Sequence, residues 1–192
     1  RRGPSVFVMN FEEEGDQSAF PNFTRGLTRL LIVGLTRFTD LFVFGTETTM
    51  AFGNPGDAKT FIAEHAIDFI LTGGTTVSAD HFSLEVMLID ASSGRSVWAE
   101  SFERTLEPTQ IVSARDEVAG RVVRALAQPY GVIANNLAHE SDGLPPTSMT
   151  AYECVSRFYQ YWRTYDRNLF DSVRSGLENA IEEYPDFAEA FA

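Results

Sequence analysis

The chain has 192 residues, a formal net charge of −12, 44% hydrophobic residues and one cysteine. The hydrophobic fraction is typical of a folded globular chain, and a single cysteine excludes an intrachain disulfide or a cysteine-cluster zinc site. The negative charge excludes nucleic acid as a partner of this segment, and no run approaches the about 18 apolar residues of a membrane span.

Short apolar runs alternate with helical patterns over the first third of the chain. Residues 5–11 and 41–44 are apolar, which is typical of strands buried on both faces. Between them, apolar residues recur at helical spacing over 23–38. A turn cluster at 52–56 precedes a further predicted helix at 58–66.

The hydrophobic period changes to two after Asp68. Strands are predicted at 68–77, 82–89 and 95–102, and the short turns between them indicate an antiparallel meander. A helix at 108–128 closes this unit. The first two strands flank a helix, so we expect them to be parallel. The sequence therefore predicts an α/β (α+β) fold, a mixed sheet in the order β-α-β-α-β-β-β-α with helices packed on it.

The punctuation of the chain predicts two folded parts. Proline, glycine and serine are dense over 129–149, which indicates a linker after a domain at 4–128. Helices are predicted beyond it at 150–163 and 169–184, and a proline after the second precedes the start of a third at 187–192. The expected C-terminal piece is thus a helical hairpin with one further helix begun.

The hairpin carries part of a repeat pattern. Leu177, Ala180 and Pro185 fall where a tetratricopeptide repeat has them in its second helix, and residues 182–190 match the junction to a next repeat. Residues 150–192 therefore resemble one tetratricopeptide repeat and the start of a truncated second. Because one repeat cannot bury its own face, we expect the natural chain to continue past Ala192, and a homodimer through the truncated helix otherwise.

The predicted hairpin of the first unit carries the most specific string. Residues 88–104 read LIDASSGRSVWAESFER, similar to the LIDA-x-x-G-x-x-x-WAE-x-F-x-R hairpin of TolB-like N-terminal domains. Residues 26–28 and 72–75 resemble the same family, whereas 22–25 and 77–79 depart from it. Such domains accompany adenylate/guanylate cyclase or winged-helix regulators in bacterial multidomain proteins and precede tetratricopeptide repeats. The resemblance implies a regulatory or protein-interaction region, with no catalytic residues to carry over.

No catalytic, cofactor-binding or metal-ligating set can be assembled from the sequence. The histidines are scattered, the acidic run 12–16 lacks calcium-loop spacing, and the glycine pair 73–74 lacks the lysine and helix of a phosphate loop. Close backbone packing or a bulge is the expected role of that pair. Cys154 is interpreted as a small buried hydrophobe. Asp90, Trp98 and Phe102 could form a ligand pocket, but sheet packing and a turn-forming aspartate are the preferred interpretation. A catalytic or metal role is not expected for the separate histidines His65, His81 and His139.

Three aromatic residues of the predicted repeat are candidates for partner binding. Tyr159, Trp162 and Tyr165 could line a peptide-binding surface, or they could pack the repeat against the first unit. Residues 129–192 hold ten acidic and four basic residues, net −6, which favours a basic partner.

The resulting hypothesis is a non-catalytic regulatory and protein-interaction region of a larger bacterial signalling protein, related to adenylate/guanylate cyclases or transcriptional regulators. The expected partner is a protein bound through the repeat surface, with no cofactor and no membrane insertion of this segment. The alternative is a small-molecule-binding sensor domain with a pocket at the strand ends. A free cysteine favours the cytoplasm, whereas a membrane span before residue 1 would place the region in the periplasm.

Overall fold

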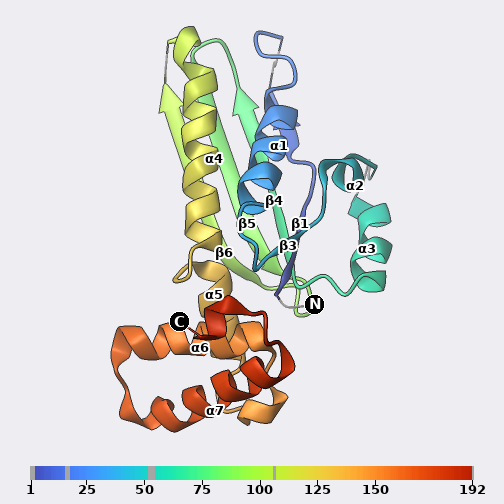
Figure 1. The fold of residues 1–192 in the computed structure, drawn as a ribbon. Coiled ribbons are helices and arrows are strands. Elements are labelled where there is room, and N and C mark those ends of the chain that lie inside the picture. Colours follow the sequence, from blue (N-terminus) through green and yellow to red (C-terminus); the bar gives the residue numbers. More distant parts are fainter. Residues whose placement is uncertain (1–2, 16–17, 52–54, 106, 192) are drawn as a thin grey trace. The chain divides into compact units, whose positions relative to one another are not determined.

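The computed structural model describes residues 3–15, 18–51, 55–105 and 107–191, and Figure 1 shows its ribbon. The chain divides into two compact units, the first formed by Pro4–Val123 and the second beginning at Arg124. The boundary falls within one helix, and each unit is described by itself. Of the turn predicted at 52–56, residues 52–54 lie outside the described residues.

The first unit is built on a mixed sheet, as the sequence predicts. Its strands follow the order β3-β1-β4-β5-β6, and β2 pairs with β4 beside β1. Strand β1 is parallel to both β3 and β4, whereas β4, β5 and β6 form the expected antiparallel meander. The strands are β1 (Ser5–Val8), β2 (Glu12–Glu14), β3 (Phe42–Val43), β4 (Phe69–Val77), β5 (His81–Asp90) and β6 (Ser96–Thr105).

Helices lie on both sides of the sheet. Helices α1 (Phe23–Leu35) and α4 (Ile111–Ala127) run side by side against one face (Figure 1), where the guanidinium of Arg115 sits 5.6 Å from the ring centre of Phe23. The 3₁₀ turn η1 (Pro108–Gln110) leads into α4. Helices α2 (Thr46–Ala51) and α3 (Pro55–Glu64) lie on the other side, where Phe61 of α3 packs near Phe7 of β1.

Alternation along β5 explains why one face of the meander is covered and the other is not. Phe82, Leu84, Val86 and Leu88 are buried, and each contributes roughly 1.5–3 kcal/mol by leaving water. The intervening Glu85 and Met87 are exposed. Phe82 meets Phe23 of α1, so the buried set faces the helices and the exposed set faces away.

The second unit is helical. Helices α6 (Ala151–Thr164) and α7 (Arg167–Glu183) form the predicted hairpin, with only Tyr165 and Asp166 between them. Their core is one cluster, to which one residue before α6 and two residues after α7 also contribute. It consists of Met149, Ala151, Cys154, Val155, Ala180, Phe187 and Ala190. A Cβ at Gly176 of α7 would lie 3.0 Å from Cys154 Sγ, so the two helices approach closely there. Whether this pair is a tetratricopeptide repeat stays a prediction.

Two segments of this unit differ from the expected pattern. The stretch 129–149 contains helix α5 (Val132–Glu140) and the 3₁₀ turn η2 (Pro146–Ser148), although its composition indicates a linker. Gly131 before α5 and the Asp142-Gly143 turn after it are typical loop residues, so the short run of apolar residues between them gives only a weak helix signal. The helix expected at 187–192 is, over its described residues, the 3₁₀ turn η3 (Ala188–Phe191).

Candidate functional site

A group of aromatic side chains, three exposed and two half-buried, lies where α6 turns into α7. We call it the aromatic surface, and it consists of Phe158, Tyr161, Trp162, Tyr165 and Phe170. Ring centres lie 6.0 Å apart for Phe158 and Trp162 and 5.6 Å apart for Trp162 and Tyr165. Tyr161 lies 5.9 Å from both Tyr165 and Phe170. The rings therefore form one connected patch.

Local sequence rules explain this arrangement. Residues four apart on a helix share a face, which pairs Phe158 with Trp162 and Tyr161 with Tyr165. Helix α6 begins at a capping box, in which the amide of Thr150 donates to Glu153 Oε2 over 2.6 Å. Asp166 then caps α7 by accepting the amide of Asn168 at 3.0 Å. With both helix ends fixed, the turn places Phe170 against the aromatic side chains of α6.

Tyr165 occupies an unusual backbone position. It ends α6 with φ at 51°, in the left-handed region that glycine or asparagine normally fills at this point. A residue with a Cβ carries a cost of about 1–2 kcal/mol there. Tyr165 is nevertheless 60% exposed, and Trp162 is 52% exposed. The backbone of Tyr165 is thus strained, and burial of its side chain does not offset this free-energy cost.

The three residues singled out from sequence occupy two environments. Trp162 and Tyr165 belong to the aromatic surface. Tyr159 is half-buried, packs on the core of the second unit and meets Tyr130 edge-on at 5.3 Å. The centre of its ring also lies 5.7 Å from that of Phe158, so Tyr159 packs beside the aromatic surface. Phe158, Tyr161 and Phe170 were not singled out, although their helical spacing to Trp162 and Tyr165 was a usable signal.

The residues weighed for chemistry lie apart in the structure. His65 stacks on Phe61 with ring centres 4.0 Å apart, His81 lies 3.9 Å from Glu103, and His139 is exposed on α5. Within the described ranges, no three His, Cys, Asp or Glu side chains gather closely enough to hold a metal ion. These positions are therefore not brought together into one site.

The remaining candidates have structural roles. Burial raises the pKa of the Cys154 thiol to about 11, and the charge of Glu153 adds to the effect, so the thiol stays protonated at neutral pH. Gly73 lies in β4, and a Cβ there would overlap the carbonyl oxygen of Glu85 on β5. Asp90 accepts the amide of Ser93 at 2.6 Å and shapes the β5–β6 turn. None of the helices that can be traced is long and apolar enough to span a bilayer.

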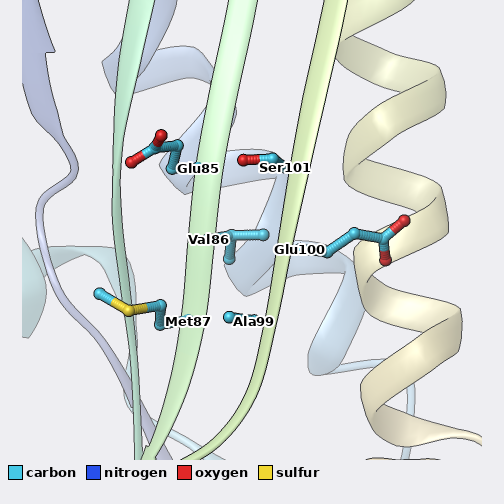
Figure 2. A pocket seen from close by; sticks show the side chains of 6 residues that line it. All are labelled: Glu85, Val86, Met87, Ala99, Glu100 and Ser101. Carbon is cyan, nitrogen blue, oxygen red and sulfur yellow. The ribbon is translucent and has the colours of Figure 1, made fainter.

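A shallow hollow lies on the meander, and sequence reasoning did not find it. It measures about 280 Å³ and is lined by residues of β5 and β6. In Figure 2, Glu85, Met87 and Ser101 point to one side of these strands, whereas Glu100 points to the other side, toward a helix. Glu100 pairs there with Arg121 of α4 at 3.0 Å. The hollow therefore belongs to the face that the helices α1 and α4 leave open.

Comparisons with known proteins relate the first unit to regulators. Residues 7–120 match the sequence model of the HilA/YgeH-like transcriptional regulator, second domain. A relative from Rhizobium meliloti (strain 1021), named "Putative adenylate cyclase 3", is 28% identical over 190 residues, which are 98% of this chain and 32% of the relative. The chain thus spans about a third of the length of that relative.

Comparisons with solved structures give weaker matches. The PelC dodecamer from Paraburkholderia phytofirmans matches with a TM-score of 0.46 and 17% identity, over 64% of this chain and 86% of the PelC chain. TolB from Acinetobacter baumannii matches with a TM-score of 0.40 and 15% identity, over 65% of this chain and 28% of TolB.

Proposed function

We propose that this chain, which through residues 7–120 belongs to the family of the HilA/YgeH-like transcriptional regulator, second domain, is a non-catalytic regulatory region. It would act by binding a protein. The relative that aligns with 98% of this chain is itself about three times as long and is named as an adenylate cyclase. An attached output domain, a nucleotide cyclase or a transcriptional regulator, would receive the signal of partner binding.

The observation that carries this proposal is the aromatic surface of the second unit. Tryptophan and tyrosine dominate the energetics of protein interfaces, because they bury large areas with few rotatable bonds. Trp162 and Tyr165 are more than half exposed and lie together, 5.6 Å apart. Strained backbone conformations such as that of Tyr165 cluster at functional sites, which supports a binding role for this turn. The patch thus has the composition, clustering and backbone cost of a binding surface.

The alternative of a small-molecule sensor has weaker support. Ligand pockets usually measure about 300–1,000 Å³ and enclose most of the ligand. The hollow on β5 and β6 measures about 280 Å³ and is shallow, so it would leave a metabolite largely in water. Protein binding therefore fits the described surface better.

Site-specific photocrosslinking in the full-length protein tests the proposal. A benzoylphenylalanine at position 162 should capture a defined protein in the native host, and a second change, Phe170→Ala, should reduce the adduct. The matched control places the same probe at Val112, which is 46% exposed in the other unit, and should give no adduct. Equal capture from both positions, or no adduct at 162, would count against the proposal.

A further inference from the structure

The open face of the meander and its free edge form a second surface. Strand β6 ends the sheet order, so one of its sides has no neighbouring strand among the described residues. It is ten residues long and contains neither lysine nor proline. Natural proteins commonly guard long edges with those residues, because unpaired amides and carbonyls recruit other strands. Such an edge is a template for strand addition.

The hydrogen-bond pattern tells which backbone groups of β6 face outward. The amide of Ser78 on the β4 side donates to the carbonyl of His81, whereas the amide of Asp90 donates to the carbonyl of Arg95 on the β6 side. Odd residues of β5 therefore bond toward β4 and even residues toward β6, since antiparallel strands alternate. Val86 lies opposite Glu100, so the even residues of β6 bond inward. The outward positions are the odd ones, Ala99, Ser101 and Glu103.

The same residues point their side chains to the open face. Glu85 lies opposite Ser101 and Met87 opposite Ala99, and all four side chains are exposed. Figure 2 shows the Glu85, Met87 and Ser101 side chains around the hollow. An added strand would place alternate side chains beside these rows. The carbonyl of Glu103 accepts a hydrogen bond from Arg104 at 2.9 Å, so pairing would use Ala99 and Ser101 first.

Charge decides which strand fits. The side chain of Glu103 is 79% exposed, Glu85 is exposed, and Glu12 and Glu14 of β2 lie beside β4 in the same sheet. His81 lies 3.9 Å from Glu103, and the guanidinium of Arg104 reaches the Glu103 carbonyl at the strand edge. Opposite charges across neighbouring strands attract, and like charges repel. An acidic strand would be rejected, because its carboxylates would lie near Glu85 and Glu103.

We propose that β6 and the open face beside it bind an extended, arginine- or lysine-rich segment of a partner protein, which adds to the sheet as a strand. A long basic side chain opposite Ser101 would cross that small residue and reach Glu85, since neighbouring strands are about 4.8 Å apart. A second base would pair with Glu103. This surface is separate from the aromatic surface, and the inference does not depend on it.

A defined probe and four variants test this inference on the whole chain. The probe is a fluorescein-labelled ten-residue peptide that alternates arginine and valine, with an alternating glutamate and valine peptide as its control. Fluorescence anisotropy should show binding of the first peptide only, and added sodium chloride should weaken it. Amide NMR signals of Ala99, Ser101 and Glu103 should shift on binding.

The variants separate strand addition from general charge attraction. Ser101→Pro removes a backbone amide that faces away from β5 and takes no part in the hydrogen bonds between β5 and β6. This variant should weaken peptide binding by about tenfold or more, whereas Ser101→Ala should not weaken it. Glu85→Gln should weaken binding severalfold, and Glu117→Gln on the outer side of α4 should leave it unchanged. Equal effects of Glu85→Gln and Glu117→Gln, or unchanged binding to a Ser101→Pro chain with native circular dichroism, would overturn the proposal. A chain dimer that Ser101→Pro dissociates would also overturn it, because a second copy would then be the occupant.

Discussion

Ser5 and Asp68 hold each other through three hydrogen bonds, although 63 residues separate them in the chain. One carboxylate oxygen of Asp68 accepts the Ser5 amide at 2.7 Å and the Ser5 hydroxyl at 2.9 Å. The amide of Asp68 donates in turn to the Ser5 hydroxyl oxygen at 2.9 Å. Ser5 is fully buried, so these bonds fix the start of β1 against the start of β4.

Replacing Asp68 should therefore destabilise the first unit. Asp68→Ala leaves the buried amide of Ser5 without this acceptor and its hydroxyl with only the 3.5 Å bond to the Ala66 carbonyl, which should cost about 1–3 kcal/mol. Urea unfolding measures the loss. Asp80→Ala is the matched control, since Asp80 is exposed and accepts a single 3.3 Å bond from Ser78. Equal losses in the two variants would show that the Ser5 contact adds nothing.

The glycine pair of β4 offers a test with a built-in control. A Cβ at Gly73 would overlap the carbonyl of Glu85, so Gly73→Ala forces the backbone apart and should cost about 2 kcal/mol or more. At Gly74 the nearest atom to a new Cβ is the Glu12 carbonyl oxygen at 3.8 Å, an ordinary contact. Gly74→Ala should be neutral or slightly stabilising. Thermal unfolding compares the two, and a larger loss at Gly74 would contradict the described register.

Arg157 should matter far more than an exposed arginine of the same unit. Its side chain is almost fully buried and donates to the carbonyl of Ser141 at 2.7 Å, with Asp142 at 3.5 Å. Arg157→Ala opens a cavity and leaves the Ser141 carbonyl with the 3.1 Å bond from the Leu144 amide alone, with an expected loss of about 2–4 kcal/mol. Arg174, which forms an exposed pair with Glu178, should be replaceable by alanine with no measurable change. Urea midpoints of the two variants decide the comparison.

The raised pKa of Cys154 predicts a loss of stability in alkali. The thiol has a pKa near 9 when unfolded and about 11 when folded, so the unfolded chain releases its proton first as the pH rises. Stability from this group is complete below pH 9 and falls between pH 9 and 11 by about 1–2 kcal/mol. Cys154→Ala should lack this fall, and the difference between the two unfolding curves isolates it. Parallel curves would contradict the assignment.

The sequence predicted the sheet because its signals are local and strong. Alternation at Phe82, Leu84, Val86 and Leu88 marks β5 and its buried face without any tertiary information. The turn at Asp90 likewise identifies the β5–β6 hairpin. Strand β2 carried no such signal, because Glu12–Glu14 is fully exposed and acidic and becomes a strand only by pairing with β4.

The aromatic surface was predictable only in part. Trp162 and Tyr165 stand out as aromatic residues in a helical pattern, but the sequence does not tell which of them is buried. The left-handed turn at Tyr165 brings Phe170 of α7 to Tyr161 of α6, and a tyrosine in that conformation carries no sequence signature. The open face of the meander was missed because a strand pattern shows alternation but not which face a helix will cover.

The same sheet topology sets an expected order of folding. Strands β4, β5 and β6 pair along the chain through short turns, so their loop-closure entropy is small. Strand β1 reaches β4 only after a loop of about 60 residues has been closed, and the Ser5–Asp68 contact is part of that step. We therefore expect the meander to carry the high φ-values of the transition state, while changes at Ser5 or Asp68 mainly accelerate unfolding.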